Sequence, residues 1–143
     1  MNLNTISPHI QSVVNAMEES LKHAFDDRVV QDGSNPERWL REHRTLRFQL
    51  PRGWGNSTVA HSFGSNIWPI SEISVMDVSH LGLRLSQPLN LDMLADIATK
   101  KRACFVFDAA SVLKSSVTNH IYRQLTKNEY FMSRKHHAVV FIG

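Results

Sequence analysis

The chain has 143 residues, a length typical of one domain, and its 42% hydrophobic and 20% charged residues exclude a disordered or collagen-like protein. It contains one cysteine, which excludes an intrachain disulfide, and no apolar run approaches the roughly 20 residues that span a bilayer, so no membrane contact is expected. The net charge of +3 suits partners that carry phosphate without identifying one.

The first 44 residues are predicted to form a helical segment. Ser7 fits an N-cap and Pro8 fits the first position of a helix. The apolar residues that follow recur at helical spacing and form one stripe: Ile10, Val13, Val14, Met17, Leu21, Ala24 and Phe25. A second, short helix is predicted to begin at 35–36 and to turn Trp39 and Leu40 inward.

From Thr45 onward the pattern changes to strands that alternate with helices. Apolar and polar side chains alternate with a period of two over residues 45–50, which predicts a strand. A turn rich in breakers covers residues 51–56, and a helix is predicted from Ser57. Further strands are predicted at 73–78, 104–107 and 138–142, a short strand or extended edge at 81–85, and helices at 90–100 and 110–126. The run at 104–107 is entirely apolar, as in strands that are buried on both faces.

This alternation predicts an α/β domain, a three-layer sandwich with a largely parallel central sheet, preceded by an N-terminal helix. Residues 1–44 would form the helical segment of a single domain, and residues 45–143 its core. In such sheets, ligands bind beyond the carboxyl ends of the strands. Two stretches with chemical interest fall at these ends, the turn after Leu50 and the residue Asp108.

A strand, a glycine-rich turn and a helix follow one another over residues 46–58. Gly53 and Gly55 let the backbone curl so that several N–H groups point into one concavity, which can hold a phosphate together with the positive end of the next helix. A hydroxyl in the first helical turn, from Ser57 or Thr58, can ligate Mg²⁺ beside that phosphate. An ordinary tight turn with a capped helix suits the same residues, so both interpretations stay open.

The stretch 46–58 resembles the Walker A loop of P-loop NTPases, and is most similar to the Pro-Arg-Gly-x-Gly-Lys-Ser-Thr form of phage terminase large subunits and related packaging or helicase-type ATPases. Residues 104–108 are similar to the Walker B strand of that family, and residues 139–142 to its next core strand. The resemblance implies a P-loop NTPase-like core at 45–143, a phage or viral protein, and binding of ATP or another NTP with Mg²⁺.

The resemblance also assigns roles to particular residues. It makes Asp108 the catalytic residue, and Ser57 and Asp108 the ligands of Mg²⁺. The residues that it assigns to the nucleotide are Arg52, Gly53, Gly55, Asn56, Ser57 and Thr58.

The sequence departs from the family at three positions, which makes the Walker A loop degenerate. Asn56 stands in place of the loop lysine, Leu50 in place of the first glycine, and Ala109 in place of the catalytic glutamate of many ATPases. Asn56 cannot supply the positive charge that the lysine brings to the β- and γ-phosphates. Arg52 could supply it instead, since some packaging ATPases carry the basic residue earlier in the loop. NTP hydrolysis is therefore expected to be weak or absent, and whether the chain is an enzyme stays open.

Other interpretations of the same residues remain open. Asp108 also suits the N-cap of a following helix. Trp54 suits either stacking on a base or partner or covering the first helix. The alternative function is a non-catalytic module on a degenerate α/β scaffold, which binds a protein partner or nucleic acid and can form homo-oligomers through its first helix. Cys104 alone in an apolar strand predicts an inert thiol, and the absence of a signal peptide in residues 1–11 predicts an intracellular, cytoplasmic protein.

Overall fold

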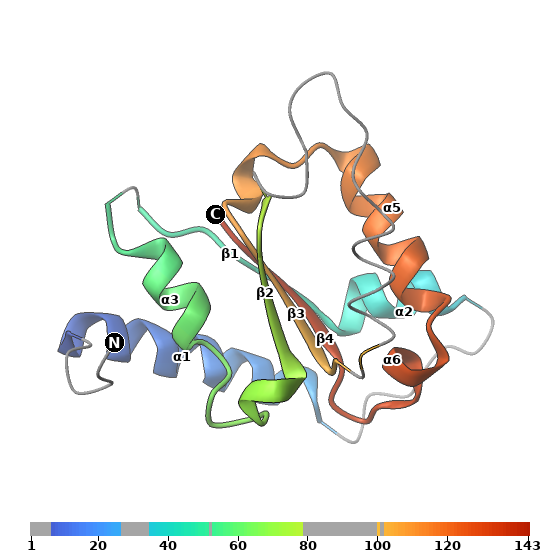
Figure 1. The fold of residues 1–143 in the computed structure, drawn as a ribbon, viewed down its shortest axis with the longest axis horizontal. Helices are drawn as coiled ribbons and strands as arrows, with labels where there is room; N and C mark the ends of the chain where they lie inside the picture. The colour runs from blue at the N-terminus through green and yellow to red at the C-terminus, as the bar shows by residue number, and fades with distance from the viewer. Residues whose placement is uncertain (1–6, 27–34, 52, 79–99, 101) are drawn as a thin grey trace.

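The computed structural model describes residues 7–26, 35–51, 53–78, 100 and 102–143, which form helices around one sheet (Figure 1). The strands are β1 (Thr45–Phe48), β2 (Ile73–Asp77), β3 (Cys104–Asp108) and β4 (Ala138–Ile142). The helices are α1 (Pro8–Ala24), α2 (Pro36–His43), α3 (Asn56–Ser62), α5 (Ser115–Thr126) and α6 (Glu129–Ser133), with 3-10 turns η2 (Ile70–Glu72) and η4 (Ala110–Val112). None of these described helices is both long and apolar enough to cross a membrane. The strand predicted at 81–85 and nearly all of the helix predicted at 90–100 lie outside the described residues.

The sheet has the strand order β1-β4-β3-β2, and all neighbouring strands are parallel. The loop after β1 leads to α3 on one face, whereas the segment after β3 leads to α5 on the other face. Because β4 lies between β1 and β3, these two connections diverge near its carboxyl end. A crevice where connections diverge in this way is the usual ligand site of an open α/β sheet.

Helices cover both faces of the sheet, so the predicted three-layer α/β sandwich is confirmed. α1 and α3 pack on one face, and α2, α5 and α6 pack on the other (Figure 1). Within β3, Cys104 and Val106 contribute to the first core, and Phe105 and Phe107 to the second. β3 and β4 are buried along their whole length. Burial raises the pKa of the Cys104 thiol, as expected for an inert cysteine in the core.

α1 begins as predicted, because the hydroxyl of Ser7 accepts a hydrogen bond from the N–H of Ile10 and so caps the helix. Glu18 lies on its buried face and is only 4% exposed. Its Oε1 accepts a hydrogen bond from the N–H of Gly64 at 2.9 Å, and its Oε2 accepts one from Nδ2 of Asn66 at 2.8 Å. The Glu18 carboxylate therefore ties α1 to the loop that follows α3.

The segment after β3 differs from the sequence prediction of one helix over 110–126. η4 covers Ala110–Val112, and α5 begins only at Ser115. Ala109 between β3 and η4 adopts the left-handed conformation, with φ 59°, which is uncommon for a residue with a Cβ. The interpretation of Asp108 as a helix N-cap is wrong, because no side chain caps either helix and their N-cap residues are Ala109 and Lys114.

His137 lies buried at the amino end of the sheet, just before β4. Its Nδ1 hydrogen-bonds to the carbonyl oxygen of Arg134, and its ring packs against those of Trp39 and Phe131. Burial lowers the pKa of His137 to about 4, the hydrogen bond to Arg134 opposes this shift, and the nearby cation of Arg44 adds to it. His137 is therefore neutral in the folded protein at neutral pH.

The stability of the protein should fall as the pH drops from about 6.5 to 4. The unfolded chain binds a proton at His137 near pH 6.5, whereas the folded chain resists it down to about 4, so acid favours unfolding in this window. The full loss should approach about 3 kcal/mol. Urea unfolding at pH 7 and pH 4 measures most of this loss. His137→Asn, which can keep the hydrogen bond to Arg134, should lose less stability in this interval than the wild type. Equal losses in the wild type and in His137→Asn would contradict the assignment, and His61→Asn on the exposed side of α3 is the control.

Candidate functional site

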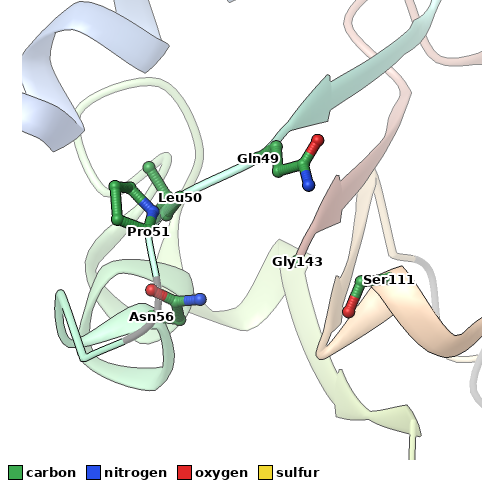
Figure 2. Close-up of a pocket in the computed structure, with 6 residues that line it drawn as sticks. All are labelled: Gln49, Leu50, Pro51, Asn56, Ser111 and Gly143. Carbon is green, nitrogen blue, oxygen red and sulfur yellow. The ribbon is translucent and has the colours of Figure 1, made fainter.

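A hollow of about 740 Å³ opens near the carboxyl ends of three strands. Its lining consists of Gln49, Leu50, Pro51, Asn56, Ser111 and Gly143 (Figure 2). Gln49 follows β1, Ser111 lies in the turn after β3, and Gly143 follows β4. Leu50, Pro51 and Asn56 lie together on one side of the hollow, with Ser111 and Gly143 across from them (Figure 2). The hollow therefore occupies the crevice where the connections after β1 and β3 diverge.

The turn after β1 has the curled backbone that its glycines permit. Gly53 and Gly55 have φ angles of 85° and 75°, in the left-handed region where glycine carries no steric cost. Gly55 is the N-cap of α3, and no side chain caps this helix. The N–H groups of the N-cap and the first helical turn have no partner within a helix. In the described part of the chain, no hydrogen bond takes up the N–H groups of Gly55, Asn56 and Ser57.

Ser57 and Asp108 meet directly, although 51 positions separate them in the sequence. The hydroxyl of Ser57 donates a hydrogen bond of 2.8 Å to Oδ2 of Asp108. Asp108 is only 6% exposed, and its Oδ1 accepts a hydrogen bond of 2.8 Å from the N–H of Ala109. One oxygen of the carboxylate thus bonds to the backbone of the next residue, while the second oxygen reaches α3. The structure brings together the two residues to which the sequence assigns Mg²⁺.

The oxygen atoms at this position suit Mg²⁺ better than a softer metal ion. Hydroxyl and carboxylate oxygens are hard ligands, and Mg²⁺ usually takes one or two carboxylates, phosphate oxygens and water rather than a cage made only by protein. Among the described residues, no group of three or more His, Cys, Asp or Glu side chains could hold a metal ion. Asp77 at the end of β2 is the register neighbour of Asp108 and is the second acidic residue at this edge. The oxygen atoms of Ser57 and Asp108 therefore suit a Mg²⁺ ion that also takes phosphate oxygens as ligands.

The other predicted site residues are only partly brought together. Arg52 lies outside the described residues. Thr58 is half-buried, and no hydrogen bond in the described part of the chain joins it to Asp108, so Ser57 is the hydroxyl that meets the carboxylate. Asn56 lines the hollow, and its buried Oδ1 has no hydrogen-bond partner among the described residues. The residue at the lysine position therefore faces the hollow with a neutral amide.

Trp54 packs on the start of α1. Its ring contacts the ring of His9 edge-on, with 4.3 Å between the centroids, and a small hollow between the loop and α1 includes Ile10 in its lining. A Cβ at Gly55 would lie 3.2 Å from Cδ1 of Ile10, so the glycine allows this close approach. Trp54 nevertheless remains 45% exposed. It covers the first helix with one part of its ring and leaves the rest accessible.

Sequence reasoning missed several residues of the site. Gln49, Ser111 and Gly143 line the hollow, and the sequence analysis assigned them no role. The only available signal was their position at or shortly after the carboxyl ends of predicted strands, where parallel sheets bind ligands. Nothing in the sequence indicates which of these strands lie next to each other.

No protein-family profile matches this chain, and no curated protein or solved structure matches it either.

Proposed function

We propose that this chain is a P-loop-like protein that binds a nucleotide through its phosphates, together with Mg²⁺, and hydrolyses it slowly or not at all. The phosphates would occupy the hollow beside Asn56, next to the N–H groups of Gly55, Asn56 and Ser57, which have no hydrogen-bond partner among the described residues. Ser57 and Asp108 would hold the metal ion, directly or through a bound water. A phage or viral origin and an intracellular location belong to the same proposal and rest on the sequence resemblance and the single cysteine.

The hydrogen bond between Ser57 and Asp108 is the observation that carries this proposal. A glycine turn needs only local residues, and an acidic residue after a strand is common. The Ser57 hydroxyl and the Asp108 carboxylate lie 2.8 Å apart only because the strand order and the loops after β1 and β3 bring them to the same place. When bound, Mg²⁺ would neutralise phosphate charge, and Ser57 and Asp108 would orient it.

The residues around this pair argue against fast hydrolysis. Asn56 lines the hollow without a positive charge, whereas a loop lysine stabilises the charge that develops on the phosphates. Ala109 follows Asp108 with an exposed methyl group and cannot activate a water molecule. The chain's own residues therefore support binding and metal orientation more than phosphoryl transfer.

A non-catalytic interaction module is the second candidate, and the exposure of Trp54 favours it. Tryptophan is enriched among the residues that dominate binding energy at protein interfaces. Trp54 is 45% exposed on the turn, and Val112, which is 68% exposed, lies in the turn after β3. A protein partner or a nucleic acid could bind such residues without any nucleotide. This function predicts that nucleotides do not bind, so one titration separates the two candidates.

Restoring the loop lysine should tighten nucleotide binding. Asn56→Lys would place a cation in the lining of the hollow and remove an acceptor that lacks a partner. Because charge-assisted contacts to phosphate contribute about 1.5–3 kcal/mol, the affinity for ATP with Mg²⁺ should rise about tenfold or more. Isothermal titration calorimetry measures both proteins.

The matched control adds the same charge at a distance from the loop. Asn15→Lys lies on the exposed side of α1, where it loses only a surface hydrogen bond from Gln11. It should bind ATP with the wild-type affinity. If neither the wild type nor Asn56→Lys binds any nucleotide at millimolar concentration, the glycine turn is only a turn, and the proposed function is wrong.

A further inference from the structure

A second hollow of about 360 Å³ adjoins the candidate site. Its lining consists of Arg47, Phe48, Gln49, Ala110, Ser111, Phe141 and Gly143. Gln49, Ser111 and Gly143 line both hollows. The two hollows therefore adjoin at the ends of β1, β4 and β3, one beside the glycine turn and the other toward the α5 face of the sheet, and together they are called the groove.

Arg47 is the charged residue in the described lining of this groove. It is exposed on β1, and its guanidinium carbon lies 4.5 Å from the centre of the Phe141 ring, which belongs to its register partner on β4. None of the ion pairs within the described part of the chain involves Arg47. A guanidinium that stacks through its flat face keeps its N–H edges available for an acceptor.

We infer that Arg47 binds phosphate oxygens of the nucleotide in this groove and supplies the positive charge that Asn56 lacks. This inference rests on the proposed function. The guanidinium presents a planar fork of donors that matches two phosphate oxygens. Neither lining includes an aspartate or glutamate, and Gln49 and Ser111 add neutral donors to both hollows.

Phe141 gives the cation a fixed position. The ring is 2% exposed and lies in the core, stacked on Phe107 with 5.3 Å between the centroids. Arg47 therefore lies on a rigid surface instead of extending freely from an edge strand. A preorganised donor loses less conformational entropy when it binds an anion.

Binding of ATP with Mg²⁺, and of inorganic triphosphate with Mg²⁺, to Arg47→Met and Arg47→Lys tests this inference. Methionine keeps an apolar chain over Phe141 but removes the charge. It should weaken the binding of both ligands about 10- to 100-fold, the usual range for a lost charge-assisted hydrogen bond. Lysine keeps the charge but lacks the planar fork, so it should recover only part of the affinity and bind better than Arg47→Met. Arg123→Met on the exposed surface of α5 removes the same charge away from the groove and should bind like the wild type.

The outcomes separate this inference from the proposed function. Wild-type affinity in Arg47→Met, with clear binding by the wild type, overturns the role of Arg47 and leaves nucleotide binding intact. A loss for ATP without a loss for triphosphate also overturns it, because Arg47 would then contact the base or sugar. The absence of binding by the wild type to either ligand overturns both the inference and the proposed function.

Discussion

Asp108→Asn is expected to weaken the binding of ATP in the presence of Mg²⁺ by about 10- to 100-fold, while ATP without metal binds as well as it does to the wild type, or better. The two effects have opposite signs for one physical reason. With Mg²⁺ bound as proposed, the carboxylate would be a metal ligand or would orient the water molecules of the ion. Without the ion, the same charge would lie beside the phosphates and repel them.

Titrations in Mg²⁺ and in EDTA measure both effects on the same protein. The substitution preserves the size of the side chain but weakens the hydrogen bonds from Ser57 and Ala109, so the melting temperature is recorded alongside. Glu42→Gln, an equal loss of charge on the exposed side of α2, should behave like the wild type. Equal weakening with and without Mg²⁺ would show that Asp108 acts on the fold and not through a metal ion.

Glu18→Ala is expected to lower the free energy of unfolding by about 2–4 kcal/mol. The carboxylate accepts two hydrogen bonds in a buried position, from the N–H of Gly64 and the amide of Asn66. Alanine leaves the N–H of Gly64 buried without a partner, which costs more than the loss of a surface contact. Gly64 cannot easily move to compensate, because its φ is 81° and a Cβ there would lie 2.9 Å from Cε3 of Trp68.

Urea denaturation of the wild type, Glu18→Ala and two comparison variants measures this loss of unfolding free energy. Glu18→Gln preserves one acceptor oxygen and should fall between the wild type and Glu18→Ala. Glu19→Ala changes the next residue of α1, whose exposed pair with Lys22 should contribute at most about 1 kcal/mol. If the two alanine variants lose equal stability, Glu18 does not anchor the loop after α3.

Local signals in the sequence predicted most of the described elements. These signals depend only on residues close together in the sequence. Examples are the cap at Ser7, the turn residues before α3, and the apolar runs of β3 and β4. The sequence did not predict the break between η4 and α5. That break lies at Leu113 and Lys114, whose backbones are extended, and neither a glycine nor a proline marks it in the sequence.

The site could be predicted only in part, because its contacts are long-range. The sequence paired Ser57 with Asp108 through a resemblance, whereas the strand order and the hydrogen bond that joins them appear only in the fold. The sequence indicates only that Arg47 is one of the polar residues that alternate with apolar ones in a strand. Its contact with Phe141 depends on the pairing of β1 with β4, which no local pattern determines.

The melting temperature of the wild type, with and without ATP, ADP and GTP, each with Mg²⁺, tests nucleotide binding most directly. A ligand at 100 times its Kd adds about 2.7 kcal/mol of stability, which corresponds to a rise of several degrees for a chain of this size. We expect such a rise for at least one nucleotide, and a smaller rise in EDTA. The same melting temperature with every nucleotide at millimolar concentration would contradict it.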